Sequence, residues 1–139
     1  MLQVVHASYS TQVASASTTY ADTGLTATIT PSATSSKVLV LVTQNGVTSD
    51  STANNAVKLQ LLRGASVMTS ITEIAGGAGG AAMFIQGLTI GTSWLDSPAT
   101  TSATTYKTQF ARAAGSGTVY VQNGSATSVS TITLLEIGA

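Results

Sequence analysis

Hydrophobic and polar positions alternate along most of this chain, in short segments separated by turn residues. The clearest segments are residues 25–30 (LTATIT), 37–42 (KVLVLV) and 131–137 (TITLLEI). Alternation with period two, in runs rich in Val, Ile and Thr, predicts β-strands. Turn residues interrupt the pattern roughly every ten residues, a spacing typical of an all-β sandwich or barrel.

The same pattern predicts strands over much of the remaining chain. Pro31 and Pro98 end two of them, because proline cannot donate a hydrogen bond to a sheet. Residues 45–55 and 99–105 are expected to be polar loops, and residues 75–82 a Gly/Ala connector. The further predicted strands are residues 3–8, 18–22, 56–63, 67–74, 83–90, 94–96, 106–113, 117–122 and 129–137.

The connections between these strands favour antiparallel pairing. They are short, and no long helical stretch with capping residues occurs, so a parallel sheet with crossover helices is disfavoured. Residues 56–63 and 67–74, joined by Arg63-Gly64-Ala65, are predicted to form a hairpin. We therefore predict an all-β fold, an antiparallel β-sandwich of jelly-roll type.

Two of the predicted strands carry apolar side chains on both faces. In residues 37–42 the valines occupy one face and the leucines the other, and residues 131–137 contain two adjacent leucines. Strands that are apolar on both faces are typically covered on both sides. We therefore expect a partner subunit to pack here. The residues expected at this interface are Val38, Leu39, Val40, Leu41, Val42, Leu134 and Leu135.

Length and charge support a single domain, residues 1–139, that is held in an assembly. By size scaling, such a chain buries roughly two-thirds of the surface that it exposes when unfolded. Charged residues make up 7% of it, five basic and five acidic, and they are scattered. No basic face is therefore expected for nucleic acid. With zero formal net charge, a free monomer has little electrostatic protection against association.

Other sequence features argue against export. The N-terminus, MLQVVHASYS, lacks a basic leader with an apolar core, and no apolar run reaches the length of a membrane span. We therefore expect synthesis and folding without export, and no membrane insertion. Asn123-Gly124-Ser125 has the spacing of a glycosylation acceptor, but without a secretion signal we interpret it as an Asn-Gly hairpin turn. The chain has no cysteine, so its stability must come from packing.

No constellation typical of an enzyme is visible, so we expect that the protein is not an enzyme. His6 is the only histidine, and nothing in its spacing selects a serine and an acid to form a triad with it. A carboxylate pair for glycoside hydrolysis would have to be assembled across the fold. The acids from which such a pair would come are Asp22, Asp50, Glu73, Asp96 and Glu136.

Cofactor and metal motifs are equally weak. Residues 77–82 (GAGGAA) formally satisfy a relaxed dinucleotide fingerprint, with Asp96 near the distance of a ribose-binding acid. The fingerprint requires a helix starting at the glycines, whereas the following segment is cut by Gly87, so we interpret it as a loop. No Asp-x-Asp or His-x-x-x-His pattern occurs. We therefore expect neither a cofactor nor a metal.

Aromatic side chains leave one alternative open, a platform for sugars. Strand-borne aromatic residues are more often anchors of a core or a subunit interface, because they bury large areas. Trp94 and Phe110 are therefore assigned first to packing. As candidate glycan contacts we name Trp94 and Tyr106, out of a set that also contains Tyr9, Tyr20 and Tyr120.

Three stretches carry a resemblance to a known group of proteins. They are residues 18–42 (TTYADTGLTATITPSATSSKVLVLV), 94–110 (WLDSPATTSATTYKTQF) and 130–137 (STITLLEI). The chain resembles small virion structural proteins of tailed bacteriophages, particularly those of marine and freshwater bacteria. The resemblance implies a homotrimeric jelly roll of the tumour-necrosis-factor type. Such proteins occur as capsid decoration or cement proteins, head-fibre knobs and tail-fibre tips, and the resemblance transfers no catalytic residue.

The expected function follows from this resemblance. We expect a homotrimeric decoration or cement protein on the capsid surface of the virion, bound to the major capsid protein and made in the host cytoplasm. The alternative is the tip domain of a tail fibre or head fibre, which binds host surface glycans. A chain that starts at Met1 and enters a strand within a few residues favours decoration over a fibre tip.

Overall fold

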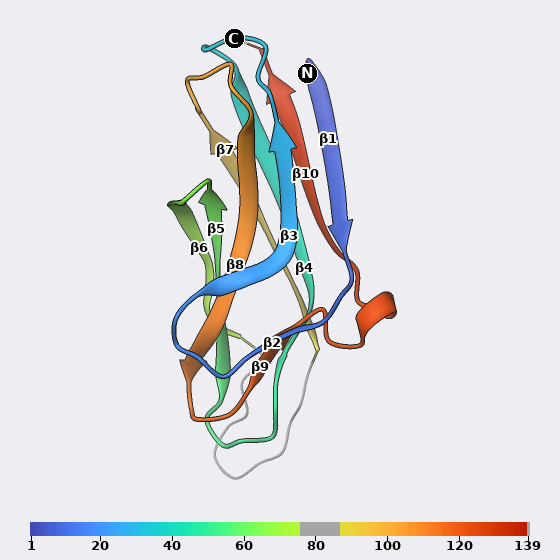
Figure 1. The fold of residues 1–139 in the computed structure, drawn as a ribbon, viewed down its shortest axis with the longest axis vertical. Helices are drawn as coiled ribbons and strands as arrows, with labels where there is room; N and C mark the ends of the chain where they lie inside the picture. The colour runs from blue at the N-terminus through green and yellow to red at the C-terminus, as the bar shows by residue number, and fades with distance from the viewer. Residues whose placement is uncertain (76–86, 139) are drawn as a thin grey trace.

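Two antiparallel sheets stack face to face in the computed structural model, which describes residues 1–75 and 87–138. Among the described residues, eight main strands divide equally between the sheets, and Figure 1 shows their arrangement. In spatial order the first sheet contains β1 (Gln3–Tyr9), β10 (Ser130–Ile137), β4 (Lys37–Ser49) and β7 (Leu88–Asp96). The second contains β3 (Ala21–Ile29), β8 (Thr104–Ala114), β5 (Ala56–Arg63) and β6 (Ser66–Ala75).

Smaller elements complete the first sheet. The short strands β9 (Val119–Val121) and β2 (Val13–Ser15) extend it from the far end of β4. A 3-10 turn, η1 (Ser125–Thr127), connects β9 to β10. Strands that are distant in sequence lie side by side, such as β1 with β10 and β3 with β8. This double-sheet arrangement of eight strands is a jelly roll, and the predicted fold class is confirmed.

The core lies between the sheets and is built from the inward positions of the alternating strands. Leu25 and Ile29 of β3 meet Val38 and Val40 of β4 in one cluster of buried side chains. A second cluster, toward β9, surrounds the buried Phe110 of β8. The predicted hairpin of β5 and β6 is present, with Val57, Leu59 and Leu61 directed inward.

Several predicted boundaries were wrong, because glycines with positive φ bend strands without ending them. Strand β3 runs continuously from 21 to 29 with a bulge at Gly24 (φ 89°), where two separate strands, residues 18–22 and 25–30, were predicted. Strand β4 continues through Gly46 (φ 61°) to Ser49, although residues from 45 onward were predicted as a loop. A Cβ at position 46 would lie 2.4 Å from the backbone N of Asn123, so only glycine fits.

Other segments also differ from the predictions. The Asn123-Gly124 turn does not close a hairpin, because β9 pairs with β2 and β4, and the turn leads into η1. Residues 94–96 are the end of β7, not a strand of their own, and β2 was not predicted. The predicted connector and the dinucleotide-like glycines, residues 76–82, lie outside the described residues, as do residues 83–86 of the predicted strand 83–90.

A buried network of polar side chains joins the two sheets. The hydroxyl of Thr108 (β8) donates to Gln44 Oε1 (β4) over 2.9 Å, and Gln44 Nε2 donates to Ser130 Oγ (β10) over 3.0 Å and to Gln122 Oε1. Thr108 has one hydroxyl hydrogen, which it donates to Gln44. Thr23 is therefore the donor of the 2.6 Å hydrogen bond between the hydroxyls of Thr23 and Thr108. All five side chains are buried.

Replacing Thr108 by Val should destabilise the fold. Valine keeps the shape of the side chain but removes the donor to Gln44 Oε1, which leaves a buried acceptor unpaired at a cost of about 1–3 kcal/mol. Urea denaturation measures the change in the free energy of unfolding. Thr105→Val is the matched control, because Thr105 lies on the outer face of the same strand and should change stability by no more than about 0.5 kcal/mol. An equal loss in both variants would contradict the assigned role of the network.

Candidate functional site

A row of apolar side chains crosses the outer face of the first sheet. Val4 of β1 lies opposite Leu135 of β10, Leu135 lies opposite Leu39 of β4, and Leu39 lies opposite Leu95 of β7. Each residue occupies an outward position of its strand, so the four side chains are neighbours on one surface. We call Val4, Leu135, Leu39 and Leu95 the apolar row.

The apolar row is exposed to solvent, and further apolar residues extend it. Val4 is 51% exposed and Leu95 52% exposed, and Leu41, two residues along β4 from Leu39, is 40% exposed. Leu2, whose backbone N–H donates to Glu136 O, and Ile137, which lies opposite Lys37, are also exposed. They belong to the end of the sandwich that holds both termini (Figure 1). Large contiguous apolar patches on protein surfaces are characteristic of interaction sites, so the apolar row is the candidate site.

The structure divides the seven predicted interface residues between the two faces of the sheet. Leu39, Leu41 and Leu135 face outward, as an interface requires. The other four point into the core of the single chain, so their assignment to a subunit interface is corrected. These buried residues are Val38, Val40, Val42 and Leu134. Alternation alone does not tell which face of a strand meets the other sheet.

One of the two predicted glycan contacts was wrong. Tyr106 is fully buried, and its hydroxyl donates to Asp96 Oδ2 over 2.7 Å. Burial raises the pKa of the Tyr106 hydroxyl far above its ordinary value, and the hydrogen bond to Asp96 raises it further. Trp94 is half-buried and packs against the core, and Phe110 is fully buried, so their assignment to packing is confirmed.

The residues considered for catalysis are occupied by structural contacts. His6 lies on the outer face of β1, where its Nδ1 is 2.8 Å from Thr133 Oγ1. Arg63 holds Asp96 through contacts of 2.7 and 2.9 Å. Glu136 accepts two hydrogen bonds from Ser32, both of 2.6 Å, and these hold the pKa of its carboxyl below the ordinary value.

Asp50 organises a loop. Its carboxylate accepts hydrogen bonds from the backbone N–H of Thr118 at 2.7 Å and of Thr52 at 3.0 Å. The bond from Thr118 is the main cause that lowers the pKa of Asp50. Among residues 1–75 and 87–138, no group of three or more acidic or histidine side chains is placed to hold a metal ion. Nor does this part of the chain contain a helix suited to crossing a membrane.

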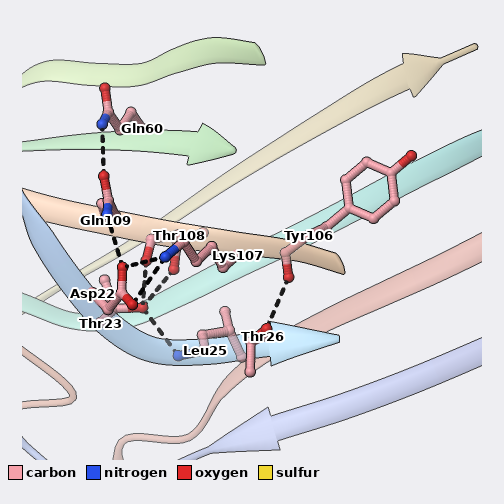
Figure 2. Close-up of polar contacts among 9 residues, drawn as sticks. All are labelled: Asp22, Thr23, Leu25, Thr26, Gln60, Tyr106, Lys107, Thr108 and Gln109. Carbon is pink, nitrogen blue, oxygen red and sulfur yellow. Dashed lines mark hydrogen bonds and ion pairs between the residues drawn. The ribbon is translucent and has the colours of Figure 1, made fainter. Parts of the chain in front are cut away.

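The outer face of the second sheet carries a row of polar side chains instead, shown in Figure 2. Gln60 Nε2 (β5) donates to Gln109 Oε1 (β8) over 2.9 Å, and Gln109 Nε2 donates to Asp22 Oδ1 (β3) over 2.8 Å. Lys107 Nζ lies 2.9 Å from Asp22 Oδ1. We call Asp22, Gln109 and Gln60 the polar row. The hydrogen bond from Gln109 is the main cause that lowers the pKa of Asp22, and Lys107 lowers it further.

The polar row was not predicted. Alternation along residues 56–63 places Lys58 and Gln60 opposite Val57, Leu59 and Leu61, on the outward face of the strand, and this was the available signal. What it lacked was the register, because Gln60 meets Gln109 and Gln109 meets Asp22 only once strands far apart in sequence are paired.

Comparison with known proteins gives a fold and no family. No family model matches the chain, and no curated protein matches it. Among solved structures it is similar to a chain of the infectious bursal disease virus VP2 subviral particle, with a TM-score of 0.50 and 11% identity. The match covers 97% of this chain but 32% of that one, so this chain spans about a third of its length. At this identity the likeness shows the sandwich fold.

The pKa of Asp22 offers a direct test of the polar row. We expect NMR titration to give a pKa below 3.8 for this carboxyl, and Gln109→Ala to raise the pKa toward that value. Since the folded-state pKa is depressed, the stabilisation by Asp22 is present above the unfolded pKa and is lost as the pH falls through the folded one. Gln12→Ala, at an exposed position outside the row, serves as the control. An unchanged pKa in Gln109→Ala would refute the assigned contact.

Proposed function

We propose that this protein is a virion structural protein, a homotrimeric decoration or cement protein that binds the major capsid protein and stabilises the shell. The observation that carries the proposal is the exposed apolar row on a jelly-roll domain, on a face where the lysine nearest the row is Lys37, at its edge opposite Ile137. The likeness to a chain from a viral particle supports the fold that the proposal needs. The resemblance to phage virion proteins supports the role and the phage setting.

A second copy of the chain is the occupant that we propose for the apolar row. The row spans the sheet from β1 to β7, and the next row of the same face contains His6, Thr133, Leu41 and Ser93, with no acidic or permanently charged side chain. Copies arranged around a three-fold axis would bury the row of each against its neighbours, as closed symmetric oligomers do. The apolar core of such an interface excludes charge, and this face provides that composition.

Placing one charge in the apolar row, at Leu95, and one beside it, at Leu41, should abolish the assembly. We expect the wild-type protein to have the mass of three chains in size-exclusion chromatography with light scattering, and Leu41→Glu combined with Leu95→Glu to have the mass of one. Both positions are exposed, so the variant should fold. Ile74→Glu is the matched control, because Ile74 is 72% exposed on β6 of the other sheet. A monomeric wild type, or a double variant that still assembles, would refute the proposed interface.

Attachment to the capsid should depend weakly on salt. Raising NaCl from about 0.1 M to about 1 M shortens the screening length from about 10 Å to about 3 Å, which weakens contacts made by ion pairs. A protein with 7% charged residues and no net charge has few such contacts to lose. Purified particles should therefore keep the protein through this range when they are sedimented and analysed by gel. Release at moderate salt would contradict attachment by apolar contacts and shape.

A further inference from the structure

We propose that the outer face of the second sheet is a binding site for a neutral saccharide, with the polar row as its recognition element. This site lies on the opposite side of the sandwich from the apolar row, so the proposal is independent of the assembly proposed above. It also differs from the predicted glycan site at Trp94 and Tyr106, neither of which is on this face.

Three open hollows share lining residues on this side of the sandwich, and we call them together the trough. The first has a volume of about 610 Å³, within the range of small-molecule sites. It shares Lys107 with a hollow of about 110 Å³ and shares Gly64 and Thr105 with another of about 240 Å³. The combined length extends across the sheet from β3 to the β5–β6 turn, which suits a chain of sugar units.

The polar row is already held in the geometry that a ligand would meet. The bond from Gln60 fixes the amide of Gln109, and the bond from Gln109 to Asp22 fixes it from the other side (Figure 2). These amide side chains are therefore already ordered in the folded protein, so binding a ligand costs less side-chain conformational entropy. Each glutamine still has a second N–H, and among the described residues Gln60 Oε1 accepts no hydrogen bond. Paired donors and acceptors of this kind match adjacent sugar hydroxyls.

The charges along the trough favour a neutral ligand. Lys107 and Asp22 neutralise each other at 2.9 Å, so neither presents a free charge to an anion or a cation. Arg63, at the edge of the trough, is held by Asp96. An ionic ligand would have to break one of these pairs, whereas hydroxyl groups can add hydrogen bonds to both partners.

The neighbouring row provides an apolar surface beside the amides. Leu62 of β5 lies opposite Val67 of β6. Leu62 is buried, so Val67, which is 56% exposed, supplies the accessible apolar area. A sugar ring has an apolar C–H face and a polar rim, which this pairing of rows would match. A peptide is disfavoured, because β8 and β5 are paired on both edges and offer no free backbone to an added strand.

Saturation-transfer difference NMR tests the site, because it observes the ligand and tolerates a large assembly. The probes are glucose, galactose, mannose and N-acetylglucosamine, with maltose and lactose as two-unit ligands. We expect signal from at least one of them, with a Kd on the order of 1 mM, and a weakening of about tenfold or more in Gln60→Ala and in Gln109→Ala. Gln60 is 9% exposed and its hydrogen bond to Gln109 is partly buried, so circular dichroism checks that both variants fold.

Three outcomes would overturn the proposal. The first is the absence of signal from every sugar. The second is binding that both variants retain, or that the control Gln12→Ala loses to the same extent, since Gln12 lies outside the trough. The third is competition in which inorganic phosphate displaces the sugar, because that would show an anion site at Lys107.

Discussion

The hydrogen bond between Thr108 and Gln44 is the interaction on which the two faces of this protein depend. It connects β8 to β4, the strands at the middle of the two sheets, through the centre of the sandwich. Apolar packing alone tolerates small slides of one sheet over the other, because dispersion contacts are non-directional. A buried polar network is directional, and leaving one member unpaired is costly. The Gln44 network therefore selects one relative position of the sheets.

The register of the paired strands brings residues that are far apart in sequence together on the outer faces of the two sheets. The residues of the apolar row come from sequence positions 4, 39, 95 and 135, and those of the polar row from 22, 60 and 109. A slip of one residue in any strand would move its side chain from the outer face to the core. The outer faces of the two sheets thus acquire opposite characters, one apolar and the other hydrogen-bonding, although both consist of the same kind of alternating strand.

Sequence alone predicted the strands and the sandwich, because period-two alternation is a local signal. It placed β5 correctly at residues 56–63. It failed where local rules were overridden, as at Gly24 and Gly46, where glycine permits a bulge and the strand continues. It also could not decide which side of residues 37–42 forms the core, since valine and leucine are both apolar. Only the position of the second sheet makes Val40 buried and Leu41 exposed.

The few acidic side chains of this protein make contacts within the chain. Asp96 is held by Arg63, Asp22 by Lys107 and Gln109, Glu136 by Ser32, and Asp50 by loop N–H groups. Glu73 accepts a hydrogen bond from Ser70 Oγ, so all five acids serve contacts within the chain, and little formal charge is left to attract or repel a partner. In the proposed assembly, shape and apolar area on the first sheet would then contribute more to association than ion pairs. A domain of this composition is suited to permanent contacts in a particle, where long-range electrostatic steering contributes little once the copies are held together.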